Sequence, residues 1–243
     1  MKFKIIFLIL ILGLISLLIT KNLKADCYDN ESNCNGVPWT SRVLTYVYPA
    51  YPQCTISIGF KTRYCNGKWQ FKYDYMHFLD PRNEGGVCTS LINWLWPQGW
   101  NNPPNWDRIR DIFKSSYADL CLQLYKEMVD AAREGGYLDQ LDCNHPRTTF
   151  SQFVGTCWSQ CSGFVDNPNG GYMIVKNVDC TVGVCCELKR SYCYDEINGV
   201  QVTIETIPGP SMDCNNQTAP DCNFGPEVQF PFQSPCSASC QIF

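Results

Sequence analysis

Apolar and polar residues alternate on both sides of Asn66-Gly67, and this alternation predicts a β-hairpin between Cys54 and His77. Asn-Gly is a strong signal for a two-residue hairpin turn, and a turn at this point determines which residues lie opposite each other. Each predicted pair on one face contains a large apolar or aromatic residue, whereas the other face is polar. The pairs on the apolar face are Tyr64–Trp69, Thr62–Phe71, Phe60–Tyr73, Ile58–Tyr75 and Ile56–His77.

Two further stretches favour β structure. Residues 43–48 contain the β-branched and aromatic residues that are typical of a strand. From Cys180 a looser version of the hairpin pattern returns, with alternating apolar residues before and after Asn198-Gly199. A two-residue turn there would mix the two faces, whereas a longer Asp195–Gly199 loop or a bulge would realign them. The register of this second hairpin stays open.

A long amphipathic helix is predicted between the two hairpins. Asn105 is a suitable N-cap and Gly135-Gly136 a suitable stop for a helix from about Trp106 to Glu134. Apolar residues recur there at spacings of three and four, which gives the helix one apolar face. These residues are Ile109, Phe113, Tyr117, Leu120, Leu124, Met128 and Ala131. Residues 80–106 are rich in Gly, Pro and Asn, which predicts a loop.

The first 25 residues have the layout of a secretory signal peptide. Lys2 and Lys4 precede an apolar run from Ile5 to Ile19, and we expect cleavage near Ala25. The run is shorter than the ~20 residues that span a bilayer, although a retained N-terminal anchor stays the alternative. Without this segment the chain carries 15 basic and 23 acidic residues, a formal charge of −8. That acidic balance disfavours nucleic acid and anionic membrane surfaces as partners.

All 17 cysteines follow Ala25, and behind an export signal this density predicts a disulfide framework. We therefore expect a secreted protein that is extracellular, periplasmic or held at the cell surface. Because the number is odd, one thiol is either free or bonded to another molecule through an intermolecular disulfide. Cys121 on the helix and Cys143 in the loop after it form the simplest pair. The adjacent Cys185 and Cys186 are expected to bond to two different partners.

The cysteine spacing also suggests an internal duplication. Cys-Thr, Tyr-Cys and Asn-Gly occur in the same order in both halves, and Cys54–Cys88 and Cys180–Cys214 have equal separations. Cysteine-rich chains also offer chance alignments, which is the alternative explanation. The structural cysteines matched in this way are Cys27, Cys34, Cys54, Cys65 and Cys88 in the first half and Cys157, Cys161, Cys180, Cys193 and Cys214 in the second.

The expected organisation has five parts. A signal peptide occupies residues 1–25 and a cysteine-rich β module residues 26–90. A tryptophan-rich loop and helical insertion cover residues 91–150, and a second cysteine-rich β module covers residues 151–215. A cysteine-tied tail occupies residues 216–243. The predicted fold class is α+β, mainly β, with two disulfide-rich hairpin modules separated by one long amphipathic helix.

The sequence contains no recognisable catalytic set. His77 is predicted on the apolar face of the first hairpin, and His145 lies in an Asn-His-Pro turn. Gly155-Thr-Cys-Trp158 is superficially similar to the nucleophile region of papain-like proteases, but no histidine follows Cys157, so we reject that resemblance. Cys-x3-Cys spacings in an exported chain favour disulfides over a metal site. We predict no catalytic residue, no metal site and no cofactor.

The one stretch with a functional character contains Trp94, Trp96, Trp100 and Trp106. Exposed indoles stack on sugars and anchor protein interfaces. The alternative is that these rings cover the helix and the hairpin as part of the core. The expected function is a structural or adhesive role without catalysis. The alternatives are a module that binds a glycan or protein partner through the Trp94–Trp106 loop, and a secreted hydrolase.

Overall fold

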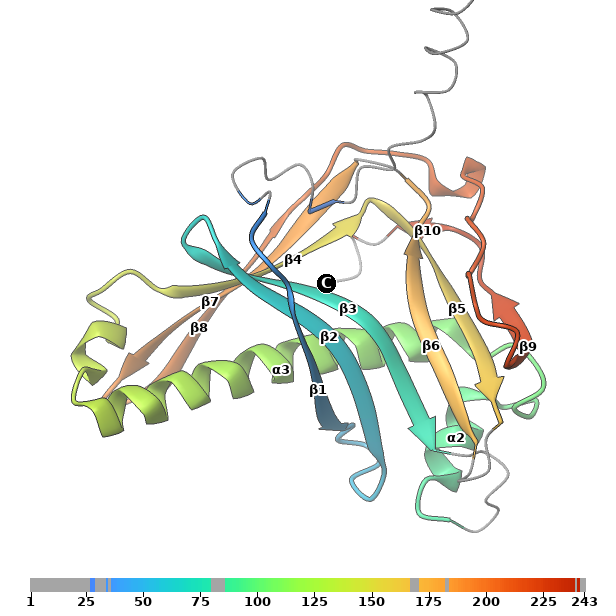
Figure 1. Cartoon of the computed structure of the whole chain (residues 1–243), viewed down its shortest axis with the longest axis horizontal. Coiled ribbons are helices and arrows are strands. Elements are labelled where there is room, and N and C mark those ends of the chain that lie inside the picture. Colours follow the sequence, from blue (N-terminus) through green and yellow to red (C-terminus); the bar gives the residue numbers. More distant parts are fainter. Residues whose placement is uncertain are drawn as a thin grey trace, which may run out of the picture.

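The computed structural model describes residues 27–28, 34, 36–79, 86–166, 171–181, 184–238 and 240. The predicted signal peptide lies outside these residues. The fold is α+β and mainly β, and the described strands form one ten-stranded sheet that is covered by a long helix (Figure 1).

The strands are β1 (Thr40–Val47), β2 (Thr55–Cys65), β3 (Lys68–Leu79), β4 (Thr148–Gly155), β5 (Cys157–Val165), β6 (Tyr172–Asp179), β7 (Cys185–Asp195), β8 (Gly199–Ile207), β9 (Val228–Gln233) and β10 (Ser237–Ala238). The helices are α2 (Thr89–Leu95) and α3 (Trp106–Gly135), and short 3-10 turns occupy Leu138–Leu141 and Cys214–Asn216.

Strand β3 is the centre of the sheet. One of its edges pairs with β2, which in turn pairs with β1. Its other edge pairs with two strands, in parallel with β4 along Trp69–Phe71 and antiparallel with β6 along Met76–Leu79. Strand β4 leads to β7 and β8, while β6 leads to β5, β9 and β10. The sheet therefore divides halfway along β3, and its two arms spread apart in Figure 1.

The β2–β3 pairing follows the predicted register only near the turn. Tyr64–Trp69, Thr62–Phe71 and Phe60–Tyr73 are paired as the Asn-Gly turn predicts. Between Gly59 and Phe60 the register shifts, so that Gly59 lies opposite Tyr75 and Ile58 lies opposite Met76. One extra residue in β3 makes this a β-bulge, which reverses the predicted faces of the β3 residues beyond it, while Ile56 and Ile58 of β2 stay buried.

The predicted position of His77 on the apolar face is therefore wrong. Beyond the bulge, Met76 and Phe78 are the fully buried residues of β3. His77 points to the other face, where its ring stacks between Tyr75 at 4.1 Å and Tyr172 at 4.2 Å, centroid to centroid. The absence of a side chain at Gly59 leaves room for this arrangement, because a Cβ there would lie 2.3 Å from the Tyr75 ring.

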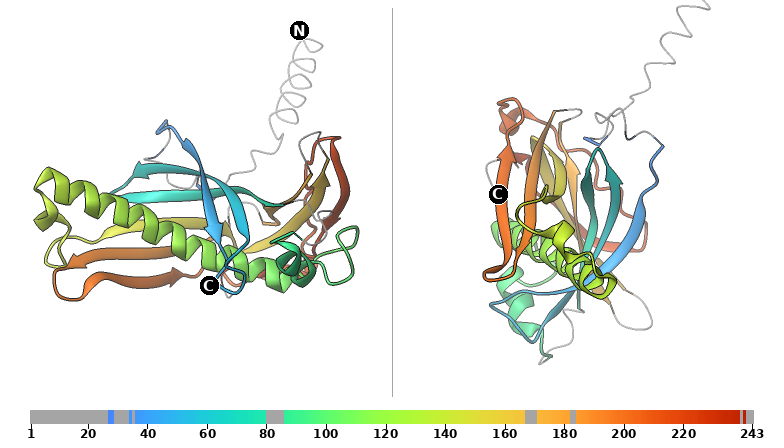
Figure 2. Two further views of the ribbon diagram at one scale, coloured as in Figure 1. Left: turned by 90° about the horizontal axis from the view of Figure 1, so that it is seen from below. Right: turned by 90° about the vertical axis from the view of Figure 1, so that its left-hand side faces the viewer.

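Helix α3 begins and ends as predicted. The Asn105 side chain accepts a hydrogen bond from the Arg108 backbone N–H, and Gly136 ends the helix with a φ of 74°. In the end-on view of Figure 2 the sheet curves around this helix, with β1 on one side and β7–β8 on the other. The core of the protein lies between the helix and the sheet.

The buried face of α3 matches the prediction only in its first half. Ile109, Phe113, Tyr117 and Leu120 are buried as expected. In the second half Tyr125, Val129 and Ala132 are buried, whereas the predicted Leu124, Met128 and Ala131 line a shallow groove of ≈ 200 Å³. The second half of α3 therefore carries two adjacent apolar stripes, one with Tyr125 and one with Leu124. The Tyr125 ring stacks on the Tyr192 ring with centroids 5.2 Å apart, and this contact places the Tyr125 stripe against the sheet.

Part of the predicted loop at residues 80–106 is helical. Residues 89–95 form α2, with Leu91, Ile92 and Leu95 buried. These apolar residues recur at spacings of one and three over less than two turns, which is too short a stretch to give a clear helical period.

The second hairpin adopts the longer loop. Asp195 lies opposite Gly199, and Tyr192 lies opposite Val202, so the apolar residues of β7 and β8 share a face. The Asp195 carboxylate accepts hydrogen bonds from the backbone N–H groups of Ile197 and Asn198. These bonds lower the pKa of Asp195 and hold the loop in shape.

Eight disulfides pair 16 of the 17 cysteines, and Cys121 is the free, buried thiol. Cys143 bonds to Cys193 and not to Cys121, which corrects the pairing proposed from sequence. The prediction for the adjacent cysteines is confirmed, because Cys185 bonds to Cys27 and Cys186 bonds to Cys240. The other bonds are Cys34–Cys65, Cys54–Cys88, Cys157–Cys214, Cys161–Cys222 and Cys180–Cys236.

The disulfide pattern does not repeat between the two halves of the chain. Cys54 bonds to Cys88, but its matched cysteine, Cys180, bonds to Cys236 instead of Cys214. The strands of both expected modules belong to one sheet. The duplication and the division into two modules stay predictions.

Candidate functional site

A cleft of ≈ 460 Å³ lies where helix α3 runs between the two sheet margins β1 and β8. We call it the β1–α3–β8 cleft. It is lined by Tyr46, Val47 and Pro49 from β1 and the turn after it, by Ser115, Ala118, Asp119 and Leu122 from α3, and by Arg190, Tyr192, Val200 and Val202 from β7 and β8.

Local sequence explains how these side chains come to face the cleft. Arg190 and Tyr192 are two positions apart on β7 and therefore point to the same face of the sheet. Each has a neighbour on β8 directly opposite, Ile204 beside Arg190 and Val202 beside Tyr192. The walls of the cleft are thus mostly apolar, and charged groups are concentrated at Arg190 and Asp119.

Arg190 is the central polar group of the cleft. Its guanidinium lies 5.7 Å from the centroid of the Tyr117 ring and is half-buried. It also lines a second, smaller cleft of ≈ 190 Å³, next to Lys114 and Lys189. Within the described part of the chain, no carboxylate forms an ion pair with Arg190. A planar guanidinium in an apolar setting is well suited to bind a carboxylate or another oxyanion.

The tyrosines of the cleft stay protonated at neutral pH. Burial raises the pKa of Tyr192 to about 12, and the adjacent Arg190 guanidinium opposes this shift. Burial also raises the pKa of Tyr46. Both hydroxyls can therefore donate hydrogen bonds, and neither is a nucleophile at neutral pH.

Buried polar groups also lie between α3 and the sheet. The hydroxyls of Tyr73 and Ser116 share a hydrogen bond of 2.9 Å, and the Tyr117 hydroxyl lies 3.1 Å from the carbonyl oxygen of Leu188. Burial raises the pKa of the Cys121 thiol to about 12. A thiol with that pKa is inert, because the thiolate is the reactive form. An intermolecular disulfide stays a prediction, and it would require Cys121 to leave the core.

The four tryptophans of the candidate binding loop are distributed over separate packing sites. Trp94 lies on α2 and stacks on Tyr48 at 5.5 Å. Trp96 is only 1% exposed and packs edge-on against Phe78. Trp100 is half-buried, with Phe164 at 5.0 Å and Phe230 at 5.3 Å. Trp106 is the first, half-buried residue of α3.

These tryptophans therefore do not form one exposed aromatic surface. In the described residues, no ring contact joins two of the four indoles, and Trp94, Trp96 and Trp100 each pack against other aromatic rings. Binding through this loop stays a prediction.

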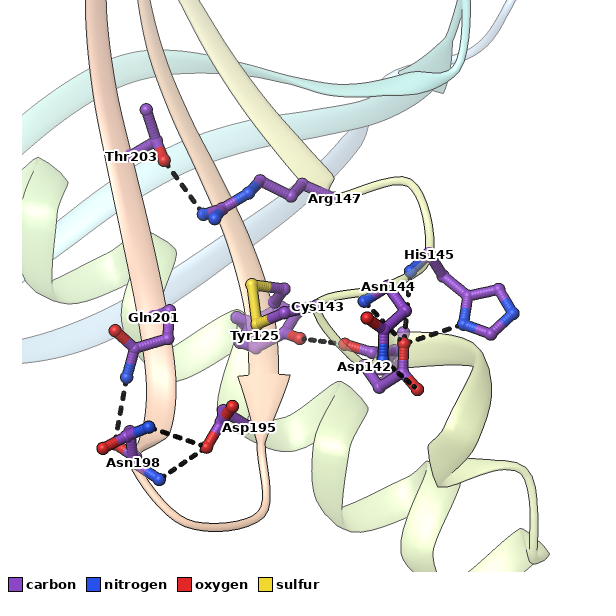
Figure 3. The surroundings of a disulfide bond; sticks show 12 residues. Tyr125, Asp142, Cys143, Asn144, His145, Arg147, Asp195, Asn198, Gln201 and Thr203 are labelled. Carbon is purple, nitrogen blue, oxygen red and sulfur yellow. Dashed lines mark hydrogen bonds and ion pairs between the residues drawn. A yellow bond between two sulfur atoms is a disulfide. The ribbon is translucent and has the colours of Figure 1, made fainter.

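The second histidine belongs to a turn. The His145 ring lies 2.8 Å from the Asp142 carboxylate, next to the Cys143–Cys193 disulfide, and its ring points outward (Figure 3). That hydrogen bond is the largest cause of the lowered pKa of Asp142. The disulfide fastens the loop after α3 to β7 (Figure 3).

The residues that line the cleft were not identified from the sequence. Arg190 shares the apolar face of its strand with Tyr192, and a charged residue on an otherwise apolar face was the one available signal. Tyr46, Asp119 and Arg190 come from separate parts of the chain, and no spacing rule connects them. All ten cysteines that we singled out as structural lie in disulfides.

In the described ranges, no group of three or more His, Cys, Asp or Glu residues is arranged to hold a metal ion. Among the same residues, no helix has the length and apolar character needed to span a membrane. No protein-family model, curated protein or solved structure matches the chain.

Proposed function

We propose that this chain has a structural or adhesive role without catalysis, and that it binds another molecule in the β1–α3–β8 cleft. Its eight disulfides indicate an extracellular, disulfide-rich protein. The observation that carries this proposal is the half-buried Arg190 guanidinium within a mostly apolar cleft.

The surrounding structure favours binding over chemistry at this cleft. Burial keeps the Tyr46 and Tyr192 hydroxyls of the cleft protonated. The Ser115 hydroxyl, which also lines the cleft, donates hydrogen bonds to the backbone carbonyls of Asp111 and Ile112 on its own helix. Small-molecule sites are commonly apolar clefts with a few polar groups that orient the ligand. A ligand with an apolar body and a carboxylate would place the body against Val200 and Val202 and the carboxylate on Arg190.

Chemical-shift mapping with small carboxylates tests this proposal. Hexanoate and benzoate are titrated into the isotope-labelled, disulfide-intact protein, and hexanol serves as the uncharged probe. We expect shifts confined to amides that line the cleft, and an affinity about tenfold weaker in Arg190→Gln, which corresponds to ~1.4 kcal/mol. The affinity for hexanol should be the same in both proteins.

Arg147→Gln is the matched control. Arg147 is exposed and donates a hydrogen bond to the Thr203 hydroxyl at 2.9 Å (Figure 3). It is not among the residues that line the cleft. Carboxylate binding should survive this change. Shifts elsewhere on the protein, or equal carboxylate affinity in Arg190→Gln, would contradict the proposal.

The two alternatives keep separate tests. Binding through the Trp94–Trp106 loop is tested on a glycan array with Trp100→Ala, since Trp100 is half-buried and its removal should spare the core better than removal of Trp96. A hydrolase would be revealed by activity against a broad substrate panel that is lost when the cleft is altered.

A further inference from the structure

Strand β8 is an edge of the sheet that lacks the usual protection against pairing. In the described structure it pairs only with β7. The pairing extends from Asp195 opposite Gly199 to Glu187 opposite Ile207. Its backbone groups on the other side are available to a further strand. Val202 is 48% exposed and Ile204 is 59% exposed, so the side chains of this edge are apolar as well as accessible.

The sequence of β8 also favours strand pairing. Six of its nine residues are β-branched, and its only charge is on Glu205. That carboxylate already forms an ion pair with Lys189 at 2.9 Å. Natural edge strands are commonly protected by proline, lysine or a very short length.

The other edge strands of the described sheet do carry such protection. Strand β1 contains Arg42 in its middle, β9 contains Pro231, and β10 has two residues. Strand β8 has nine residues with neither a basic residue nor a proline. The difference singles out β8 as an edge that is suited to pairing.

We propose that β8 pairs antiparallel with β8 of a second copy of this chain, about a two-fold axis at Thr203, and joins two sheets into one. This inference goes beyond the cleft proposal, because it concerns the free backbone edge of β8 and the exposed Ile204, which does not line the β1–α3–β8 cleft, although Val200 and Val202 belong to both surfaces.

The β8 sequence is self-complementary in that register. Val202 lies opposite Ile204 of the partner subunit, and Val200 lies opposite Thr206 of the partner subunit, so β-branched residues meet on the helix-facing side. On the other side, Gln201 lies opposite Glu205 of the partner subunit. Among the paired strand residues no like charges face each other, and cross-strand pairs of β-branched residues stabilise a sheet. The nearest like charges are the two Arg147 side chains, each hydrogen-bonded to the Thr203 hydroxyl of its own chain. A two-fold interface of this kind uses the same patch on both copies.

Sedimentation velocity of the disulfide-intact protein tests this inference. The protein concentration is varied from about 1 to 200 μM, a range that covers the dissociation constants of weak dimers. The wild-type protein should form a dimer, whereas Ile204→Lys should be a monomer, because it places lysines beside the two-fold axis. The conservative Ile204→Val should remain a dimer. Ile197→Lys is the matched control, since Ile197 is 92% exposed in the β7–β8 loop and lies outside the paired strands.

Backbone hydrogen exchange provides the second measurement, and it does not depend on a variant that folds. Amides of β8 should become better protected as the protein concentration rises, while amides of the β1 edge should not. A wild-type monomer at the highest concentration would overturn the inference, and so would a dimer that Ile204→Lys leaves intact. Ile204→Lys leaves the cleft residues Arg190, Val200 and Val202 in place, so carboxylate binding measured on this monomeric variant distinguishes failure of the dimer from failure of the cleft proposal.

Discussion

The ring stack around His77 leads to a sharp prediction on acid stability. Burial lowers the pKa of His77 to about 4, from the ordinary value near 6.5. Between pH 6.5 and 4 the unfolded chain therefore binds a proton at this residue while the folded chain does not. Protonation then favours unfolding, and the contribution of His77 to stability is present above pH 6.5 and is lost as the pH falls toward 4.

The magnitude follows from the two pKa values. At 1.36 kcal/mol for each pKa unit, the difference corresponds to ~3 kcal/mol, which solvent screening at a half-buried ring reduces to roughly 2–3 kcal/mol. His77→Phe keeps a ring between Tyr75 and Tyr172 but cannot titrate. Between pH 7 and pH 3.5, the decrease in the free energy of unfolding should therefore be larger for the wild type than for His77→Phe, by roughly 2–3 kcal/mol.

The assay is denaturant unfolding with the disulfides intact, carried out on both proteins at each pH. Comparing the two removes the contribution of the carboxylates, which titrate in both. An NMR titration of the imidazole nitrogens gives the pKa directly, and the only other histidine signal is that of His145. A His77 pKa at or above 6.5 would refute the reasoning, since the tyrosine rings would then stabilise the imidazolium more than burial destabilises it.

Three further changes test the fold by denaturant unfolding or thiol chemistry. Asn105→Ala removes the hydrogen bond to the Arg108 backbone N–H and should lower stability by about 1 kcal/mol; an unchanged stability would mean that the cap is dispensable. Gly59→Ala places a Cβ 2.3 Å from the Tyr75 ring and should cost about 1–3 kcal/mol, with the β2–β3 NMR signals most affected. The Cys121 thiol should be inert to a thiol reagent in the folded protein and react once per chain in denaturant, and rapid reaction without denaturant would show that α3 is not sealed against the sheet.

The features that the sequence predicts correctly are local ones. The caps at Asn105 and Gly136 determine the ends of α3, and the Asn66-Gly67 turn determines the first pairs of β2 and β3. The long loop of the second hairpin was one of two open alternatives, and agreement between the faces of β7 and β8 selected it. In each case the deciding residues lie within a few positions of each other.

The features that the sequence could not predict depend on distant contacts. The bulge at Gly59 arises where β3 changes partners from β4 to β6, and those strands lie about 70 residues or more further along the chain, a separation at which local pairing rules do not apply. The Cys27–Cys185 bond spans 158 residues. The β1–α3–β8 cleft joins three such segments, so its residues could not be grouped in advance.

The most direct test of the account is the disulfide map of the oxidised protein, obtained by digestion without reduction and mass spectrometry. We expect Cys185 linked to Cys27, Cys186 linked to Cys240, and Cys121 as the single free thiol. These links join the N-terminal and C-terminal segments to β7, the strand that carries Arg190. A Cys121–Cys143 bond, or a repeat of the first-half pairing as Cys180–Cys214, would contradict the arrangement of the sheet and the cleft built on it.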